Sequence, residues 1–571
     1  MTQEQILEDY AKLRSVLDVR DAKYRRNYNR YANAGVRRDD IRSFYGQPFG
    51  MWQRASEDDT SPVPINQLIK SAIDTHVSKM SQTKVRPFFT PVNGEYKTRK
   101  ACRAAQQYFD ELYEVQDMAG KAILALRDAE IFDTGALWVD EQQAAICRLA
   151  PWEVYFDAAE IHYGKLTRIV IRRDFYPIMY LKDLVKKGSQ ADAKLLQYRG
   201  AKCSNVVYYD LAGKQRHDLI DGEVVKTSKL ESDTCPIAFV YYTQPIAGNR
   251  ATSLCDDLLP IQLTMDMLSQ RIKDAAELTP ANTIFVPSAA GFSGSMVSNR
   301  IGNVYTYSQG PQGGLPVVST PRPIDPMFLQ LLQYWEGVGF NTAGISQLSA
   351  QAKKPSGLNS GVALQTLEDV ESERHNVILQ CYIRLWMDVA KIMLEVMPES
   401  ADILPKTKGR AKVSWKDIKR ERELFSIQFS ATSSLSKDPK TKMEQIEKLI
   451  QMGLVDKDYI TSLLEMPDLE DCYSIGTAAH DAAQNIIDRA IEEEEYTYNE
   501  VVGTDLLYRE CVLTILRLDA ANESQEVIGR VVGLMRAVKN TMDAVAVELA
   551  PPPAPAPVPQ VAPPPLPAAT I

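Results

Sequence analysis

The sequence lacks the motifs that mark the common classes of enzyme. It contains no GxxxxGK[ST] loop for phosphates, no HExxH zinc motif and no GxSxG nucleophile turn. The glycines of "GVGFNTAG" have the wrong spacing for a dinucleotide-binding turn, and they follow a helical segment instead of a strand. We therefore expect a protein that is not an enzyme, with no catalytic residues and no cofactor.

Cysteine and histidine are both scarce and scattered. The chain has eight cysteines without a CxxC pair, and its five histidines show no ligand spacing. This pattern excludes a disulfide framework and predicts reduced core cysteines in a cytosolic setting. We expect no metal site.

Excess positive charge and long apolar runs are also missing. The formal net charge of -9 argues against a basic surface that grips nucleic acid through its phosphates. The negative charge does not exclude a protein that lets nucleic acid slide past its surface. No apolar run is long enough to span a bilayer, and no signal peptide precedes the first helix. We expect a soluble protein, intracellular when made, without a membrane partner.

The chain has enough apolar residues for several packed units. Its 571 residues are 45% hydrophobic, which predicts two to four units with cores of their own. Helical periodicity alternates with strand-like runs at 166–176, 204–210 and 236–243. The predicted fold class is therefore α+β, with short antiparallel strands.

Residues 4–34 are expected to form a helix with Ile6, Tyr10, Leu13 and Leu17 on one face. Its second half carries basic and aromatic side chains at helical spacing, and two interpretations remain open. The helix either presents a basic, aromatic surface to a polyanion or partner, or exposes its charges to solvent and turns a tyrosine stripe to the core. These side chains are Arg20, Lys23, Arg25, Arg26 and Arg30 with Tyr24, Tyr28 and Tyr31.

A pair of helices with a small β insertion is expected after Thr252. The first helix carries Pro260 as a possible kink and ends near Pro280, and the second runs from Asp325 to about Asn341. The Gly- and Ser-rich stretch between them contains short strand-like pieces. A loop rich in Ser, Gly and Lys follows from Gly344, and a long helix then continues to Met397.

This order of segments resembles the portal protein of tailed bacteriophages. The resemblance rests on "PINQLIKSAIDTHVSKMSQTKVRPFFTPV", "DTGALWV", "LAPWEVYFDAAE" and "VSWKDIKRERELFSIQFS", and on the helix, β tip, helix, loop and helix that come between them. It covers about residues 1–490. It implies a portal-like fold with long helices, a mixed α/β wing, a two-helix stem, a small β-containing clip and a helical crown.

The resemblance implies the following division of the chain. It consists of the N-terminal wing (1–251), the first stem helix (252–280), the clip (281–322), the second stem helix (323–343), the tunnel loop (344–361), the long wing helix with returning strands (362–436), the crown with C-terminal helices (437–550) and a disordered Pro-rich tail (551–571).

Candidate functional residues follow from this resemblance. On the tunnel loop, the residues that face DNA would be Lys353, Lys354, Ser356, Gly357 and Ser360. The alternative is that this loop is only a linker on the protein surface. Along the stem, residues lining the channel would be Asp266, Arg271, Lys273, Asp274 and Glu277. Clip residues that contact partners would be Arg300, Tyr305 and Tyr307.

The implied function is a ring-shaped channel at one capsid vertex, through which the genome is packaged, retained and ejected. The implied partners are other copies of the chain in a twelve-fold ring, double-stranded DNA, the terminase large subunit, tail adaptors, and the major capsid and scaffolding proteins. The implied location is the virion, and the host cytoplasm during assembly. The alternative is a nucleic-acid-processing virion enzyme with an unrecognised active site.

Overall fold

The structure is a computed structural model that divides into two compact units. The first unit contains Met1–Phe89, Arg103–Arg422 and Ile427–Ser430, and the second contains Thr90–Cys102, Glu423–Ser426 and Ala431–Ile571. The structure describes residues 3–32, 66–81, 85, 87–92, 96–157, 159–160, 165–177, 202–245, 251–278, 283–285, 317–319, 325–345, 361–397, 402–403, 413–415, 418, 425–429, 482–492, 503–520 and 523–548.

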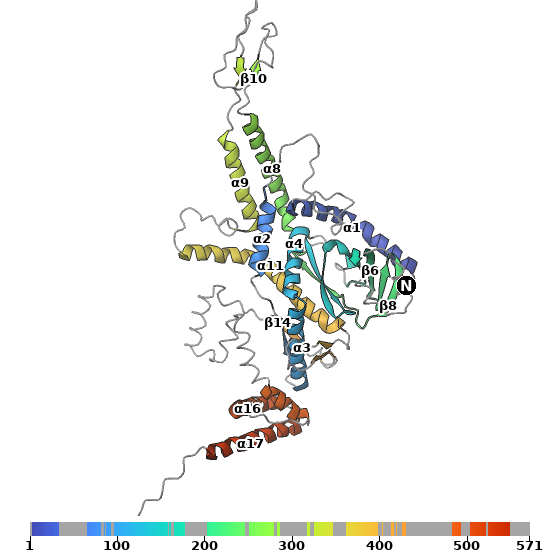
Figure 1. The fold of residues 1–571 in the computed structure, drawn as a ribbon, viewed down its shortest axis with the longest axis vertical. Helices are drawn as coiled ribbons and strands as arrows, with labels where there is room; N and C mark the ends of the chain where they lie inside the picture. The colour runs from blue at the N-terminus through green and yellow to red at the C-terminus, as the bar shows by residue number, and fades with distance from the viewer. Residues whose placement is uncertain are drawn as a thin grey trace, which may run out of the picture. The chain divides into compact units, whose positions relative to one another are not determined.

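Helices and short strands alternate along the described chain (Figure 1). The helices are α1 (Gln3–Ala32), α2 (Leu68–Ser81), α3 (Tyr96–Val115), α4 (Met118–Phe132), the short 3-10 helix η2 (Pro151–Glu153), α8 (Leu254–Leu278), α9 (Pro326–Ala343), α11 (Gly361–Val396), α16 (Thr504–Ala520) and α17 (Gln525–Glu548). This mixture of helix and sheet confirms the coarse prediction of an α+β protein.

The strands form small antiparallel sheets. The two largest in the described part have the orders β3-β2-β9 and β4-β5-β6-β7-β8. The strands are β1 (Pro87–Pro91), β2 (Thr134–Asp140), β3 (Ala145–Leu149), β4 (Val154–Phe156), β5 (Arg168–Pro177), β6 (Lys202–Asp210), β7 (Gln215–Ile220), β8 (Glu223–Lys229), β9 (Ile237–Tyr241), β10 (Thr283–Phe285), β11 (Val317–Ser319), β12 (Asp402–Ile403), β13 (Val413–Ser414) and β14 (Phe425–Phe429).

The five-stranded sheet buries both of its faces. Alternate side chains of a strand point to opposite faces, and β5 shows this: Ile169 and Ile171 pack in a core with the three-stranded sheet, whereas Val170 packs in a different core. That second core is completed by Ile6 and Leu17 of α1. Helix α1 therefore covers one face of the five-stranded sheet, and the three-stranded sheet covers the other.

The tyrosines of α1 face the protein interior. Tyr24 is buried in a core with α2, α4 and α8, and Tyr28 and Tyr31 pack against the same core. This confirms the tyrosine stripe toward the core, but the solvent-exposed charges that the same interpretation expected are not found at Arg20 and Lys23, which are largely buried in ion pairs. The basic side chains lie beside the stripe, and Arg20, Lys23 and Arg26 form ion pairs within the chain.

Helices α8 and α9 lie side by side (Figure 1), and their bases pack on α2. Gly339 of α9 packs tightly against α2, because an added Cβ atom there would meet Leu68 Cδ2 at 2.4 Å. Helix α8 runs through Pro260. After α8 and before α9, strands β10 and β11 pair antiparallel, with Ile284 opposite Val318. The predicted helix, β insertion and helix are thus present.

The described core of the second unit is helical. Residues 482–492 form a helix that packs with α16 and α17 around Ile487, Leu507 and Val531. The guanidinium of Arg530 donates a hydrogen bond to the carbonyl of Ile491 at 2.7 Å. The C-terminal helices expected before residue 550 are present as α16 and α17.

Cysteine chemistry agrees with the prediction for the described residues. The seven cysteines in this part of the chain form no disulfide, and five of them are buried. Among the same residues, no helix combines the length and apolar character needed to cross a bilayer.

Glu153 is a buried carboxyl group that we expect to lower stability at alkaline pH. It accepts a hydrogen bond from the backbone N–H of Ala150 at 2.9 Å, but burial outweighs this and raises its pKa from 4.5 to about 7. Its contribution to stability is therefore full below pH 4.5 and is lost as the pH rises through 7. Glu153→Gln keeps an acceptor without the charge. We expect it to raise the free energy of unfolding at pH 8 by up to about 3 kcal/mol.

Urea titrations of the Glu153→Gln variant and the wild type, at pH 8 and at pH 4.5, measure this difference. Glu160→Gln is the control, because Glu160 is only half-buried. An equal effect of Glu153→Gln at both pH values would contradict the expectation.

Candidate functional site: the paired helices and the polar junction at their base

The α8–α9 pair exposes large apolar side chains. On α8, Leu263 and Met267 are 40% and 50% exposed, and they lie four residues apart on one face. On α9, apolar exposure is concentrated in the first three turns. Its exposed apolar residues are Met327 (65%), Phe328 (37%), Leu329 (51%) and Tyr334 (62%). Met327, Phe328 and Leu329 are consecutive, so their side chains point to different sides of α9. We call the six exposed residues together the apolar face of the pair.

Both helices have well-defined ends next to this face. The side chain of Asp325 caps α9 by accepting a hydrogen bond from the N–H of Met327 at 3.0 Å. Gly344 ends α9 with φ of 72°, a left-handed conformation that glycine adopts without strain. At the start of α8, Ser253 Oγ accepts from the N–H of Asp256 at 3.1 Å, and Asp256 Oδ2 accepts from the N–H of Ser253 at 3.1 Å. These reciprocal bonds form a capping box.

The structure places the predicted channel residues of α8 in different environments. Asp266 accepts a hydrogen bond from the backbone N–H of Asn66 at 2.8 Å, so its carboxylate is engaged at the entry to α2. Arg271 and Asp274 are exposed, and Lys273 is half-buried. Asp274 also accepts a hydrogen bond from Gln270 at 2.7 Å. Glu277 belongs to α8, but its side chain lies outside the described residues.

The other predicted site residues lie outside the described part of the chain. They are Lys353, Lys354, Ser356, Gly357 and Ser360 of the predicted tunnel loop, and Arg300, Tyr305 and Tyr307 of the predicted clip. Their assignments stay predictions. The described structure fixes only the ends of the loop segment, which leaves α9 at Gly344 and enters α11 at Gly361.

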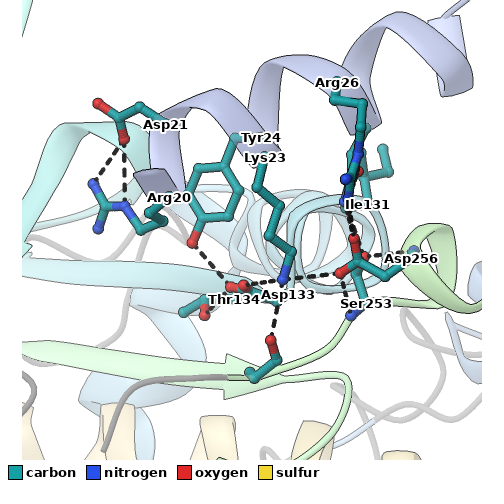
Figure 2. Close-up of polar contacts among 12 residues, drawn as sticks. Arg20, Asp21, Lys23, Tyr24, Arg26, Ile131, Asp133, Thr134, Ser253 and Asp256 are labelled. Atoms are coloured by element: carbon teal, nitrogen blue, oxygen red, sulfur yellow. Dashed lines mark hydrogen bonds and ion pairs between the residues drawn. The ribbon is translucent and has the colours of Figure 1, made fainter. Parts of the chain in front are cut away.

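The base of α8 is held by a network that we call the polar junction (Figure 2). At its centre, the amine of Lys23 lies 2.9 Å from Asp133 Oδ2 and 2.8 Å from Asp256 Oδ2. Arg26 adds a second ion pair to Asp256 at 2.9 Å. Asn27 donates to the carbonyl of Ile131 at 3.0 Å and to Asp256 at 3.1 Å. Helix α1 is thereby tied both to the end of α4 and to the start of α8.

The two carboxylates of the polar junction differ in electrostatic environment. Burial raises the pKa of Asp133, although Lys23 and hydrogen bonds from Thr134 and Tyr24 oppose this effect. Burial also acts to raise the pKa of Asp256, but hydrogen bonding and charge from Lys23, with a hydrogen bond from Asn27, outweigh it and hold the pKa below its usual value. Both carboxylates therefore depend on Lys23 for their charged form.

The backbone at Asp133 is constrained as well. This residue ends α4 with φ of 116°, and its N–H still donates to the carbonyl of Ala129. A positive φ is uncommon for a residue with a side chain. The hydrogen bonds that Asp133 accepts from Tyr24 at 2.9 Å and from Thr134 at 2.7 Å hold its side chain in this turn.

A cleft of about 610 Å³ lies between β9 and α11. Its floor includes Phe239 and two cysteines, and Arg384 and Lys391 stand among the charged groups of its lining. Burial raises the pKa of Cys235 to about 12 and also raises that of Cys381. An activated cysteine has a lowered pKa instead, so neither thiol is a nucleophile near neutral pH.

No three metal-binding side chains come together within the described stretches. The polar junction was not predicted from the sequence. Its basic residues had been noted on α1, but their acidic partners lie 110 and 230 positions further along the chain, for Lys23 with Asp133 and for Arg26 with Asp256. The one local signal was the Ser253 to Asp256 spacing of a capping box. A scan against models of protein families finds no match to this chain, and a search of curated proteins finds no relative.

Proposed function

We propose that the chain is a subunit of a portal-type ring, which forms a channel for double-stranded DNA at one vertex of a phage capsid. The apolar face of the α8–α9 pair is the observation that carries this proposal. A helix with apolar residues around its circumference is normally buried, and the described residues of the chain leave this face uncovered. A large exposed apolar patch is typical of an interaction site.

A second copy of the same chain is the partner we assign to this face. A surface that meets a different surface of an identical copy makes a head-to-tail contact, which closes into a ring when the rotation per subunit divides a full turn. The two paired helices of each subunit, α8 and α9, suit a channel lining. Each helix can present one side to the axis of the ring and another side to the neighbouring subunit. The resemblance implies twelve copies.

The ends of the pair favour the same proposal. The polar junction fixes the base of α8 to α1 and α4 through ion pairs of 2.8–2.9 Å, so the pair is held firmly on its unit. Beyond α9 the chain passes into the segment with Lys353 and Lys354 and then into α11. In the proposed ring this segment reaches into the channel and meets phosphates. The β10–β11 tip is where a terminase motor and later tail adaptors would dock, and the capsid and scaffolding proteins surround the ring.

Electron microscopy of the purified protein in negative stain tests the proposal directly. We expect closed rings with a central hole, and sedimentation coefficients of an oligomer at micromolar concentration. A monodisperse monomer under several salt conditions would contradict it. Rings formed by a chain that also hydrolyses nucleic acid or nucleotide would favour the enzyme alternative instead.

Charge reversal in the predicted loop tests the assignment to DNA. Changing Lys353→Glu and Lys354→Glu together should leave rings intact but reduce packaging or retention of the full genome. The added repulsion acts over about 8 Å at physiological salt, so the defect should grow as salt is lowered. Packaged DNA length, measured at two salt concentrations, is the readout.

The matched control changes two exposed lysines of β8, Lys226→Glu with Lys229→Glu. This control alters the net charge by the same amount, and we expect it to package normally. Wild-type packaging by the Lys353/Lys354 variant at low salt would remove these lysines from the channel.

A further inference from the structure

Strand β9 forms one edge of the three-stranded sheet, whose order is β3-β2-β9. Two backbone hydrogen bonds show how it is held to β2. The N–H of Val139 donates to the carbonyl of Pro236 at 2.9 Å, and the N–H of Tyr242 donates to the carbonyl of Asp133 at 3.3 Å. In an antiparallel pair, every second residue turns its N–H and C=O toward the partner strand. Residues 236, 238, 240 and 242 therefore bond to β2.

The three residues between these positions turn their backbone groups away from β2. They are Ile237, Phe239 and Tyr241, and none of the described strands pairs with this edge. The carbonyl of Ile237 accepts a hydrogen bond from the Cys235 thiol at 3.4 Å, and a thiol is a weak donor. The sequence of β9, IAFVY, contains no charged residue and no proline, which are the residues that usually protect a sheet edge. An edge of this kind is a template for pairing with another chain.

The cleft between β9 and α11 lies along this free edge. Neighbouring side chains of a strand point to opposite faces of a sheet, and the cleft is lined by Phe239 and Tyr241 from one face and by Ala238 from the other. A single space that touches both faces of β9 lies along an edge of the strand, and β2 occupies the opposite edge. The unpaired backbone groups of β9 therefore border an open space of about 610 Å³.

The walls of the cleft have the length and the surface that suit an added strand. The lining residues of α11 recur at helical spacing from Cys381 to Ile392, which is about 17 Å at 1.5 Å per residue. The five residues of β9 also cover about 17 Å, at 3.3 Å per residue. Leu166, which precedes β5, also lines the cleft and belongs with Phe239 to the core between the two larger sheets. Side chains on one side of an added strand would therefore meet apolar groups, and those on the other side would meet α11.

The charged groups of α11 around the cleft compensate one another. Asp388 lies 3.8 Å from Arg384 and 4.0 Å from Lys391, as two ion pairs. Glu395 accepts a hydrogen bond from Thr234. These two basic and two acidic side chains carry no net charge, so they leave no charge for an occupant to neutralise. Because burying an unpaired charge is costly, uncharged polar side chains fit this wall best.

We propose that the free edge of β9 binds an extended segment of a separate polypeptide, with apolar side chains at alternate positions and uncharged polar ones between them. The segment adds a fourth strand to the sheet, and its backbone pairs with Ile237, Phe239 and Tyr241. Its apolar side chains lie beside Phe239 and Leu166, and its polar side chains lie beside α11. Such strand addition takes affinity from main-chain hydrogen bonds and specificity from alternate side chains. The edge belongs to a single chain, so the proposal does not depend on ring formation.

Hydrogen exchange of the full-length protein, with and without a synthetic peptide, tests the site. The probe is Thr-Val-Thr-Val-Thr-Val-Thr, blocked at both ends. At saturating peptide we expect the backbone amides of Ile237, Phe239 and Tyr241 to exchange about tenfold more slowly. The amides of Ala238 and Val240 already bond to β2, so their rates should not change. Unchanged rates at the three edge amides overturn the proposal. Protection of these amides before the peptide is added also overturns it, because the protein itself would then cover the edge.

Two methylated forms of the peptide are matched controls for strand pairing. One form carries N-methyl groups on its valines and the other on its last three threonines, so each form blocks the N–H groups of one edge of the peptide. The side chains decide which edge faces β9, because the valines turn to Phe239 and the threonines to α11. One form should therefore bind like the unmethylated peptide. The other should bind more weakly, by about two- to tenfold for each lost hydrogen bond. Fluorescence anisotropy of the labelled peptides measures the affinities, and equal affinities of the two methylated forms overturn the proposal.

Discussion

Changing Met267→Asp and Leu329→Asp together is expected to abolish ring assembly and leave a folded monomer. Both side chains are about half exposed in the single chain, at 50% and 51%, so the fold does not depend on them. In the proposed interface the exposed half of each side chain would be buried, which is worth about half of the roughly 1.5–3 kcal/mol for a whole large side chain. Losing both weakens each contact about ten- to a hundredfold in association constant, and each introduced carboxylate adds the cost of burying a charge. Sedimentation velocity at micromolar concentration measures the shift from oligomer to monomer.

Two controls separate a lost interface from a damaged fold. Met267→Leu with Leu329→Met keeps the apolar surface, and this pair should assemble like the wild type. Val19→Asp adds a charge at an apolar position of α1 that is 81% exposed, and it should also assemble. If the double aspartate variant still formed wild-type rings, the apolar face would not be the contact between copies.

Asp133→Ala is expected to have the largest effect on stability, about 3–5 kcal/mol. The change removes the acceptor of Lys23, Tyr24 and Thr134. The φ of 116° disfavours aspartate and alanine alike, but alanine would have to hold this turn without the side-chain hydrogen bonds that stabilise it. Asp133→Asn should cost less, because the amide oxygen still accepts from Tyr24. Hydrogen exchange of α1 peptides reports the local opening free energy in the full-length protein.

A double-mutant cycle identifies the cause of this loss. Lys23→Met removes the amine that Asp133 and Asp256 share, so Asp133→Asn should cost much less in its presence than in the wild type. Lys12→Met is the control. Its ion pair with Glu8 is exposed to solvent on both sides, and its loss should hardly change stability. Purely additive effects of Asp133→Asn and Lys23→Met would contradict an electrostatic role for the polar junction.

The sequence predicted most helices to within a few residues, because the signals that start and end a helix are local. The helix expected to start at Asp325 begins at Pro326, with Asp325 as its N-cap. The long helix expected from 362 to 397 is α11, Gly361–Val396. Alternation also located β5, β6 and β9. It missed β7 and β8, because "QRHDLI" and "EVVKTSK" carry mostly polar side chains, and their pairing depends on the neighbouring strand β6.

The environments of the predicted site residues were harder to predict from the sequence than the helices and strands. Asp266 had been assigned to the channel from the resemblance, yet its carboxylate accepts hydrogen bonds from Asn66. Periodicity tells which face of a helix a residue occupies, but it does not tell which other element lies against that face. The roles of the loop and clip residues stay predictions, as does the portal-like arrangement as a whole.

By itself, the sequence determined the fold class, α+β, and the order of the secondary-structure elements. That order is two helices around a small β insertion, then a loop and a long helix. These features depend on local periodicity, caps and turn residues. Only the tertiary structure decided which charges meet. Lys23 lies between Asp133 and Asp256, and His76 lies between Glu130 and His375. The partners in these groups are far apart in the chain, so burial in a shared core, and no local pattern, selects them.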